Sequence, residues 1–368
     1  MKHKDNQKSE FDNFFISTVD YTNKISLIEK IKAVGRIFHS FEANKKLENL
    51  VAHFKPDIAH LHLVYHQLPI SIVSVLKNKQ IPIVHTLHDY KPVCPTYSFI
   101  SKNKICEACK NKKFYFSFLN RCNNNAMVPS MINMLEMYMH HTLGYYDLVD
   151  TYITPSKFML EKLVDFGMPR QKLVHIPNFI DSTKYPIKNK SENYILYVGR
   201  LVPVKGVYTL LYAMDKLAQF NLKVKIIGDG PDRKNLEKLK YELSLTNVEF
   251  LGYQQFNSIL SYLSKCMFTV LPSEWYENCP MSVLESMVMG KPVIGSNIGG
   301  IPELINNNTD GLLFEPGNAD DLADKINYLF TNHQKMKIMG HNARNKIIME
   351  YNPDIYFQKL ENVYKKYI

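Results

Sequence analysis

The stretch that decides the fold is Pro272-Ser-Glu-Trp-Tyr-Glu-Asn-Cys-Pro-Met-Ser-Val-Leu-Glu-Ser-Met-Val-Met-Gly-Lys-Pro-Val-Ile294. Its order predicts a loop, a helix that begins near Met281, a Gly-Lys-Pro turn and a buried strand. Glu277 lies in the loop and Glu285 lies one to two turns into the helix, so we expect both carboxylates to face one crevice. Ionised carboxylates only accept hydrogen bonds, and they therefore suit a ligand that carries hydroxyl groups. The pair alone is unspecific, and its strand–loop–helix–strand context makes it informative.

The chain around this stretch alternates short apolar strands with helices. Apolar strands of this length between helices predict a parallel sheet that is covered on both faces, and therefore an α/β fold. The expected strands are Tyr194–Val198, Val224–Ile227, Val248–Phe250, Phe268–Leu271 and Pro292–Gly295. The expected helices are Lys205–Phe220, Pro231–Ser244, Phe256–Ser264 and Met281–Met289. The end of the chain is also expected to be helical, with a turn at Asn352-Pro353.

Glycine turns follow the first two of these strands. In Val198-Gly-Arg-Leu-Val-Pro-Val-Lys-Gly206, Gly199 permits a sharp turn, and Arg200 and Lys205 place two cations beside a helix N-terminus. Open α/β sheets bind ligands at such strand ends, and a diphosphate is an anion that fits there. The alternative is an ordinary strand–helix turn with solvated charges. Gly228-Asp-Gly230 repeats the pattern, although it also makes a plain turn.

The first half of the chain alternates in a similar but less regular way. A polar segment from Asn178 to Ser191, which contains Pro186, predicts a linker between two α/β units. Ser156 is expected to cap the helix that follows it. The expected strands are 57–63, 81–87, 151–154 and 173–176, and the other expected helices are 69–79 and 129–146.

Four of the six cysteines lie in an insert of about residues 93–125, with the spacing Cys94-x11-Cys106-x2-Cys109-x12-Cys122. Structural disulfides are rare in cytosolic proteins, so the cluster needs another explanation. One interpretation is a structural zinc ion, because a Cys-x2-Cys pair with two further cysteines can form a tetrahedral site. The other is a set of buried or unbonded thiols, which the non-standard spacing favours.

Charge narrows the class of partner. The formal net charge is +10, and residues 1–180 hold 23 Lys+Arg against 15 Asp+Glu, a net charge of +8. Such a basic half is typical of proteins that bind nucleic acid, anionic lipid or an anionic substrate, and it can also simply keep a protein in solution. No nucleic-acid-binding motif accompanies the charge, so we expect no nucleic-acid partner.

Hydropathy bears on the compartment. The chain has no run of 18 apolar residues, so we expect no membrane-spanning helix. Its polar start, Met1–Glu10, lacks the apolar core of a secretory signal. Both observations predict a cytoplasmic protein. The methionine-rich helix expected at 129–146 has two interpretations, packing in the core or peripheral contact with an anionic membrane at its inner face.

Taken together, the opening stretch and the turn with Arg200 and Lys205 resemble the retaining glycosyltransferase family 4, also called glycosyl transferases group 1. The match is tight from about Tyr194 to Pro316 and looser from Pro56 to Ile180. The resemblance implies a GT-B-type fold, in which two Rossmann-like domains face each other across a cleft. The expected parts are an acceptor-side domain at residues 1–181, a nucleotide-sugar donor domain at 192–345, and a helical segment at 346–368 that packs back on the first domain.

The resemblance also implies roles for the residues of the donor domain. Arg200 and Lys205 would bind the donor diphosphate and offset the charge of the leaving group. Glu277 would hold the hydroxyls of the donor sugar near the reacting carbon, and Glu285 would accept hydrogen bonds from the ribose. Backbone amides and turns would hold the phosphate and border the nucleotide. The residues implied in these last roles are Asn278, Cys279, Pro280, Met281, Gly199, Gly228, Gly230 and either Leu251 or Tyr253.

On the acceptor-side domain the resemblance places His88 and Asp89 near the sugar and the acceptor. The alternative for this pair is a structural hydrogen bond, and His85 points to the other side of its strand. The family's reaction retains the anomeric configuration. No Asp-x-Asp occurs in the chain, so nothing in it indicates a metal-held diphosphate, and we expect no required cofactor beyond the nucleotide-diphosphate sugar. The implied acceptor is a glycan or lipid-linked glycan of bacterial surface polysaccharide synthesis.

The chain departs from the family pattern at its start. Family members usually open with a strand, a Gly-Gly loop and a helix, and this chain reaches Asp12-Asn-Phe-Phe-Ile-Ser17 without them. We therefore expect a shortened first domain. An alternative function is then a truncated, weakly active or inactive nucleotide-sugar binding protein. A sugar-nucleotide epimerase on the same fold is a further alternative.

Overall fold

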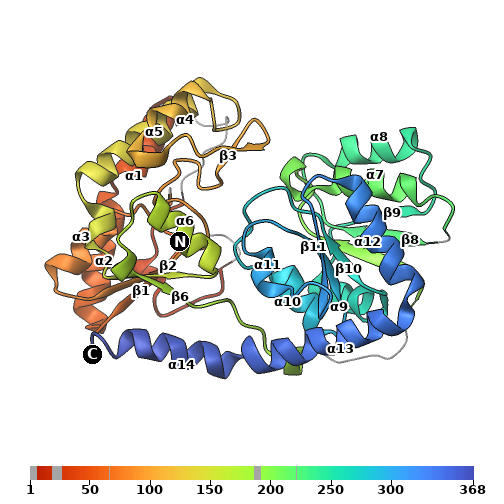
Figure 1. Cartoon of the computed structure of the whole chain (residues 1–368). Helices are drawn as coiled ribbons and strands as arrows, with labels where there is room; N and C mark the ends of the chain where they lie inside the picture. The colour runs from red at the N-terminus through yellow and green to blue at the C-terminus, as the bar shows by residue number, and fades with distance from the viewer. Residues whose placement is uncertain (1–5, 19–26, 66, 186–191, 221) are drawn as a thin grey trace.

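The computed structural model describes residues 6–18, 27–65, 67–185, 192–220 and 222–368. It has two α/β halves that face each other, and the C-terminal helices run along one side of both (Figure 1). The expected linker is described only as far as Tyr185, so Pro186 and the residues up to 191 lie outside the described residues. The same holds for the first five residues of the polar N-terminus.

The N-terminal half is built on a parallel four-stranded sheet in the order β1-β2-β5-β6. Its strands are β1 (Ala59–His62), β2 (Ile83–Thr86), β5 (Thr151–Thr154) and β6 (Leu173–His175). Its helices are α1 (Leu27–Phe38), α2 (Phe41–Phe54), α3 (Ile72–Asn78), α4 (Tyr115–Leu119), α5 (Met127–Thr142) and α6 (Lys157–Asp165). The cysteine-rich insert forms a small hairpin, β3 (Ile100–Ser101) with β4 (Lys104–Ile105), followed by α4.

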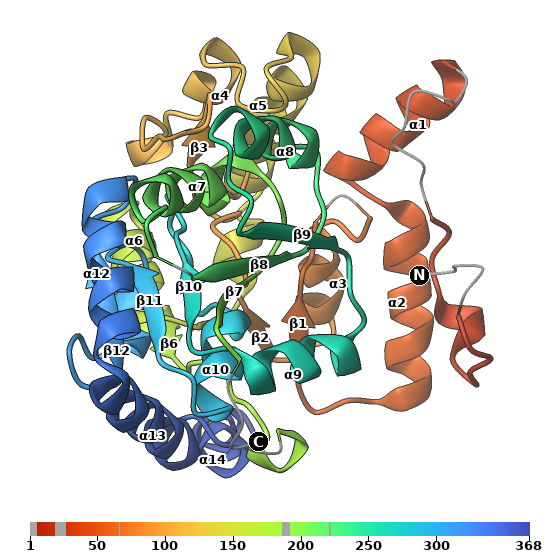
Figure 2. The same ribbon diagram turned by 90° about the vertical axis from the view of Figure 1, so that its right-hand side faces the viewer.

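The C-terminal half is built on a parallel six-stranded sheet in the order β12-β11-β10-β7-β8-β9 (Figure 2). Its strands are β7 (Tyr194–Val198), β8 (Lys223–Ile227), β9 (Val248–Gly252), β10 (Thr269–Leu271), β11 (Val293–Ser296) and β12 (Gly311–Phe314). Its helices are α7 (Val207–Lys216), α8 (Arg233–Glu242), α9 (Phe256–Lys265), α10 (Met281–Val288), α11 (Ile301–Leu304), α12 (Ala319–Thr331) and α13 (His333–Glu350).

Alternation along β7 explains why this sheet is covered on both faces. Ile195 and Tyr197 point into a core that α7 and α12 complete, whereas Tyr194 and Leu196 point into a second core with α9, α10 and α13. Successive side chains of a strand point to opposite faces, so a strand that is apolar at every position needs helices on both sides. The α/β fold with parallel sheets that the sequence predicted is confirmed.

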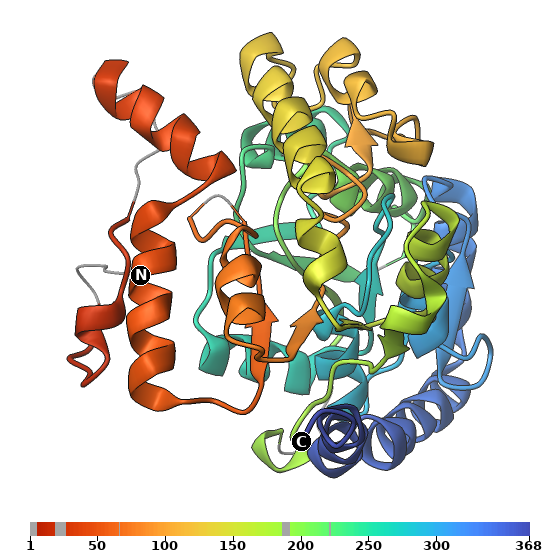
Figure 3. The same cartoon turned by 90° about the vertical axis from the view of Figure 1, so that its left-hand side faces the viewer.

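The C-terminal segment crosses back to the first half. The helix α13 (His333–Glu350) runs without interruption across residues 345 and 346, where the sequence predicted the boundary of the donor domain. Asn352 separates α13 from α14 (Pro353–Tyr364), and its side chain caps α14 by accepting a hydrogen bond from Ile355 N. In α14, Val363 is buried against Val84 and other residues on one face of the four-stranded sheet. The hydroxyl of Tyr364 lies 2.5 Å from His60 Nδ1. This helix lies beneath the sheet of the N-terminal half (Figures 1 and 3).

Candidate functional site

The C-terminal half reverses its strand order beside β7. From β7 the chain builds β8 and β9 on one side, and it then returns to place β10 on the other side. Loops that leave two such strands at their carboxyl ends diverge, and open α/β sheets bind ligands in the crevice between them. The loop after β7 carries Arg200 and Lys205, and the loop after β10 carries Glu277. The fold therefore brings these two segments to one crevice.

A partly buried ion pair joins the two loops. Lys205 Nζ lies 2.5 Å from Glu277 Oε1, and the hydroxyl of Ser273 donates to the same oxygen at 2.7 Å. The side chain of Glu277 is 8% exposed and that of Lys205 is 20% exposed. The ammonium also lies 5.0 Å from the ring centre of Trp275, within the range of a cation–π contact. The pair thus fixes a cation and a carboxylate at the point where the strand order reverses.

Close backbone packing explains the glycines beside this pair. A Cβ atom at Gly228, where φ is +138°, would stand 1.8 Å from the carbonyl oxygen of Gly199. A Cβ atom at Gly230 would stand 2.2 Å from the carbonyl oxygen of Leu201. Only glycine permits this approach of the β7 and β8 loops. Arg200, in the first of these loops, is exposed.

The next part of the site lies at the start of α10, where Asn178 contacts Cys279. Asn178 Nδ2 donates to the carbonyl oxygen of Cys279 at 3.0 Å, and no side chain in the described part of the chain caps the first turn of α10. The backbone N–H groups from Asn278 to Met281 lead into this helix start, which is the kind of place that binds anions. Glu285 lies in the second turn of α10, and burial raises the pKa of its carboxyl. Leu251, near the end of β9, is partly buried.

His88 and Asp89 approach the crevice from the end of β2, and each has partners other than its neighbour. His88 Nε2 lies 2.9 Å from His62 Nδ1, and partial desolvation lowers the pKa of His88. Asp89 accepts from the hydroxyl of Tyr65 and from Lys91 N, the latter at 3.0 Å. Burial raises the pKa of Asp89 against the opposing effect of these hydrogen bonds. No hydrogen bond joins the two among the described residues, so the structural bond that was the alternative is not found between them.

The two halves meet around a hollow of about 140 Å³. Asn278 Nδ2 donates to the carbonyl oxygen of His88 across this meeting point at 2.8 Å. Two further polar atoms, Trp275 Nε1 and Asn278 Oδ1, are buried there without a hydrogen-bond partner among the described residues. The lining residues are His88, Asp89, Tyr90, Tyr97, Pro155, Asn178, Trp275, Tyr276, Glu277, Asn278, Cys279 and Pro280. Candidates from both halves thus share one cavity. The predicted residues that do not line it are Arg200, Lys205, Met281, Glu285, Leu251 and the glycines Gly199, Gly228 and Gly230.

Two family models match adjacent parts of the chain. The model for Glycosyltransferase Family 4 matches residues 29–184, and the model for Glycosyl transferases group 1 matches residues 181–346. Between them they cover both halves and every site residue described above. The chain belongs to this family of glycosyltransferases.

The sequence of this glycosyltransferase is similar to those of several known proteins, which differ in length. An uncharacterised glycosyltransferase of Methanocaldococcus jannaschii is 27% identical over 340 residues, which cover 92% of this chain and 81% of the relative. The sulfoquinovosyl transferase SQD2 of Arabidopsis thaliana is 28% identical over 328 residues, 83% of this chain and 56% of the relative. The capsular polysaccharide biosynthesis glycosyltransferase CapM of Staphylococcus aureus is 23% identical over 236 residues, 59% of this chain and 61% of the relative. Relatives in polysaccharide synthesis are therefore among those that it matches.

Solved structures share its fold. The crystal structure of Anabaena HepE in complex with UDP-glucose has a TM-score of 0.65 at 19% identity, and the match covers 88% of this chain and 82% of that one. A sucrose-phosphate synthase of Thermosynechococcus elongatus has a TM-score of 0.67 at 19% identity, and its match covers 88% of this chain and 77% of that one. The GT-B-type fold that the resemblance implied is confirmed for the glycosyltransferase.

Some residues of the crevice were missed from the sequence. Ser273, Trp275 and Asn178 contact the predicted residues directly, and Tyr276 reaches into the other half of the glycosyltransferase. Trp275 carried one usable signal, because it is the only tryptophan of the chain and stands two residues before Glu277. The others carried none, since serine, asparagine and tyrosine are common in loops.

The cysteine cluster gives the zinc interpretation no support. All six cysteines are unbonded, and Cys94 and Cys109 are buried, which raises the pKa of both thiols. Among the described residues, no three His, Cys, Asp or Glu side chains are placed to hold a metal ion. The zinc site stays a prediction, and no role proposed below depends on it.

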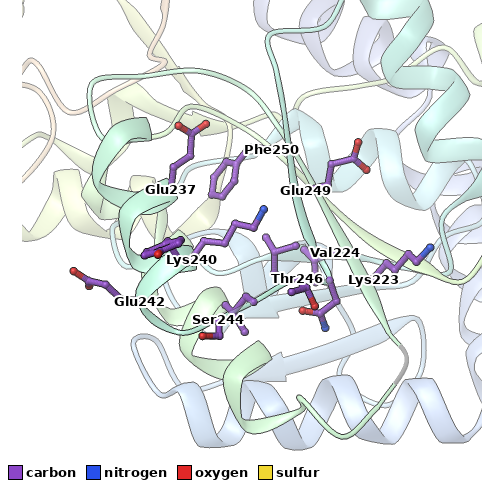
Figure 4. Close-up of a pocket in the computed structure, with 13 residues that line it drawn as sticks. Lys223, Val224, Glu237, Lys240, Glu242, Ser244, Thr246, Glu249 and Phe250 are labelled. Carbon is purple, nitrogen blue, oxygen red and sulfur yellow. The ribbon is translucent and has the colours of Figure 1, made fainter.

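A hollow of about 1160 Å³, larger than the one at which the two halves meet, lies away from this crevice. It opens where β8 and β9 begin, next to the end of α8, and is thus at the opposite edge of the sheet from the carboxyl ends (Figure 4). Charges of both signs line it, including Lys223, Lys240, Glu237 and Glu249. Size alone therefore does not identify the site, because the predicted residues gather elsewhere.

Proposed function

We propose that this glycosyltransferase moves a sugar from a nucleotide-diphosphate donor to a glycan or lipid-linked acceptor, with retention of the anomeric configuration, in bacterial surface polysaccharide synthesis. The observation that carries the proposal is the Lys205–Glu277 pair at the strand-order reversal, in loops that meet the His88–Asp89 segment of the other half. The capsular polysaccharide relative supports the pathway. The UDP-glucose complex of Anabaena HepE makes UDP-sugars the first donors to test.

The donor diphosphate would lie against Arg200, Lys205 and the start of α10. As the glycosidic bond breaks, negative charge grows on the diphosphate and positive charge grows on the sugar. Fixed cations accelerate such a step in proportion to the charge that develops, and each well-placed group is worth about 3 kcal/mol. Glu277 already holds Lys205 in place, so little reorganisation would be needed when the donor arrives. Retention would follow from attack on the same face of the sugar within the ion pair.

The donor sugar would lie beside Glu277, with the ribose at Glu285 and the base near Leu251. The two unpartnered atoms of the hollow, Trp275 Nε1 and Asn278 Oδ1, support a hydroxyl-bearing ligand there. One is a donor and the other an acceptor, and a sugar hydroxyl can both accept and donate. A buried polar group without a partner costs about 1–3 kcal/mol, so a ligand that pairs both would gain correspondingly in affinity.

The fluorescence of Trp275 offers a direct test of donor binding, because the chain has no other tryptophan. We expect one class of nucleotide-diphosphate sugar to change this fluorescence and to raise the melting temperature together. A donor at 100 times its dissociation constant should add about 2.7 kcal/mol to the free energy of unfolding. The proposal fails if no nucleotide-diphosphate sugar produces either signal.

An assay of donor turnover distinguishes a glycosyltransferase from an inactive binding protein and from an epimerase. We expect transfer or slow hydrolysis of the donor by the wild type, and its loss in Glu277→Gln. Glu249→Gln is the matched control, since Glu249 is an exposed carboxylate at the distant hollow. Donor binding without any turnover would support the inactive binding protein instead. Release of a stereoisomer of the donor sugar would support an epimerase.

The face shared by α4 and α5 supports peripheral contact with an anionic membrane at the cytoplasmic side. None of the described helices is long and apolar enough to cross a membrane. The methionine-rich helix α5 divides by side, with Met137 fully buried and other apolar side chains exposed. The exposed apolar residues of α4 and α5 are Tyr115, Leu119, Met127, Val128, Met131 and Leu135. Both helices lie along the outer edge of the N-terminal half, away from α14 (Figure 1).

Cations lie at both ends of α4, beside this apolar face. Residues 98–135 hold six Lys+Arg against one acidic residue, which gives a net charge of +5. That acidic residue, Glu107, is paired with Lys162. Lys112, Lys113 and Arg121 are exposed at the two ends of α4. Apolar side chains beside cations are typical of surfaces that bind anionic bilayers.

Vesicle flotation tests this contact. We expect binding to phosphatidylglycerol vesicles and not to phosphatidylcholine vesicles. Replacing Lys112 and Lys113 with Gln should weaken binding roughly 30-fold, because each cation near the surface adds about 1 kcal/mol. Tyr241→Gln is the control, since Tyr241 is 86% exposed on the other half. Equal binding to both vesicle types, or by the double variant, would contradict the contact while leaving donor binding unaffected.

A further inference from the structure

Tyr276, the residue before Glu277, extends from the loop after β10 to the cysteine-rich insert of the N-terminal half. The hydroxyl of Tyr276 donates to Glu107 Oε1 at 2.7 Å, although the two residues lie 169 positions apart in the chain. Its ring packs on Phe158 of α6, with the centroids 4.8 Å apart, and edge-on to Phe99 of the insert at 6.2 Å. A side chain of the C-terminal half is therefore bound by residues of the N-terminal half.

Electrostatic contacts hold the side chain of Tyr276 in addition to the apolar ones, and together these contacts form what we call the Tyr276 grip. Glu107 Oε1 also accepts from Lys162 Nζ of α6 at 2.8 Å, so the oxygen that binds Tyr276 is held by a cation as well. The same ammonium lies 5.3 Å from the centre of the Tyr276 ring, within cation–π range. The hydroxyl of Tyr90 donates to the backbone carbonyl of Tyr276 at 3.4 Å. Burial and the bond to Glu107 raise the pKa of Tyr276 to about 12, so the phenol stays a donor at neutral pH.

The consequence for Glu277 comes through the backbone. Its own N–H bonds to the carbonyl of Trp275 at 2.8 Å, and its carbonyl accepts from Gly300 N at 2.6 Å. Its side chain meets Lys205, while the side chain of Tyr276 is held in the other half. Two adjacent residues are thus anchored to the two halves of the molecule. Any shift of Tyr276 must move Glu277 as well.

We infer that Glu107 is a positioning residue that acts on Glu277 through Tyr276. The inference rests on the proposed function, in which Glu277 holds the donor sugar. The side chains that hold the side chain of Tyr276 belong to the N-terminal half, whereas the proposed donor contacts belong to the C-terminal half; the four are Glu107, Lys162, Phe158 and Phe99. The grip therefore forms only when the halves meet. It sets the fraction of molecules in which the donor and acceptor sides are aligned, and so acts on kcat more than on donor affinity.

A double-mutant cycle tests the inference. Tyr276→Phe removes only the hydroxyl, and Glu107→Gln keeps the shape but removes the charge. We expect each change to lower kcat about tenfold, with the donor dissociation constant from Trp275 fluorescence within twofold of the wild type. The double variant should lose about as much as the more severe single variant, because both changes act on the same Tyr276–Glu107 contact. Asp165→Asn is the matched control, since it removes an exposed ion pair with Lys110 of the same insert and should leave kcat unchanged.

Hydrogen–deuterium exchange gives a readout that does not depend on turnover. Tyr276→Phe should speed amide exchange both in residues 98–110 and in residues 273–280, with circular dichroism unchanged. Unchanged kcat and exchange in both single variants would overturn the inference, as would additive losses or an equal loss in Asp165→Asn. If the wild type turns over no donor, the proposed function fails, and exchange alone still decides whether the grip couples the two segments.

Discussion

The ammonium of Lys205 and the carboxylate of Glu277 lie 2.5 Å apart and join the loops that follow β7 and β10. The sequence separates them by 72 positions, and the reversal of strand order brings them together. Ser273 completes the pair by donating to the same carboxylate oxygen. Because Glu277 is largely buried, neither charge can be removed alone without leaving the other poorly compensated.

Lys205→Met should therefore destabilise the protein as well as inactivate it. Loss of one partner of a buried pair costs about 3–5 kcal/mol, and the partial exposure of Lys205 places the expected loss near 3 kcal/mol or below. Lys205→Met combined with Glu277→Gln should recover most of that stability and none of the activity. Urea unfolding of the three proteins measures the difference. A double variant as unstable as the single one would show that the pair does not stabilise the fold.

The sequence predicted the strands of the C-terminal half within about two residues, because each is an apolar run bounded by turns. β12 was missed, since Gly311-Leu-Leu-Phe314 is short and follows an asparagine-rich turn that reads as loop. Motif spacing singled out Lys205 and Glu277 separately, but it could not reveal that they bond. Contacts such as Tyr276–Glu107 depend on how two independently folded surfaces meet, and no local pattern encodes that meeting.

Gly228→Ala should unfold the donor side more readily. The backbone at Gly228 has a φ of +138°, which other residues rarely adopt, and an added Cβ would stand 1.8 Å from the Gly199 carbonyl oxygen. Backbone strain of this kind costs about 1–3 kcal/mol before the steric clash is added. Gly35→Ala is the control, because an added Cβ there would meet no described atom within 4 Å outside the backbone of α1 and the neighbouring residues. If urea unfolding shows the same loss of stability in Gly228→Ala and in Gly35→Ala, the loops after β7 and β8 can separate without a cost in free energy.

Stability should fall as the pH drops below about 6.5, because the fold keeps buried histidines neutral. Burial, with the nearby His62, His60 and His88, lowers the pKa of His85 to about 3. Burial likewise lowers the pKa of His60 to about 4. The unfolded chain takes up protons from about pH 6.5 downward and the folded chain does not, so each such group adds a slope of up to about 1.4 kcal/mol per pH unit.

His85→Leu tests the largest of these contributions. His85 is 3% exposed, and its Nδ1 has no hydrogen-bond partner among the described residues, so an apolar replacement strands no partner of that nitrogen. We expect the variant to lose less stability than the wild type between pH 6.5 and pH 4.5, by up to about 1.4 kcal/mol per pH unit. Urea unfolding at several pH values in this window measures both slopes. Identical slopes would mean that His85 does not control the acid sensitivity.

Glu303→Gln should loosen the contact between the halves at the start of α6, next to Phe158, whose ring also packs on Tyr276. Both oxygens of Glu303 accept backbone N–H bonds at the start of α6, from Lys157 at 2.8 Å and from Phe158 at 2.6 Å. Glu303 belongs to α11 of the C-terminal half, so one half supplies an anionic cap to a helix of the other. An anion at a helix N-terminus contributes about 0.3–1 kcal/mol, and a capping side chain about 1 kcal/mol.

That small energy matters for the arrangement of the halves because it exists only when they touch. We expect Glu303→Gln to lower the free energy of unfolding by about 1 kcal/mol and to raise the radius of gyration in small-angle X-ray scattering. Glu161→Gln is the matched control, since it removes an exposed charge from α6 itself without a bond to the other half. An equal change in both variants would assign the effect to the charge of α6. A loss of stability with an unchanged radius would assign it to capping alone, with the halves held by Tyr276 and its partners.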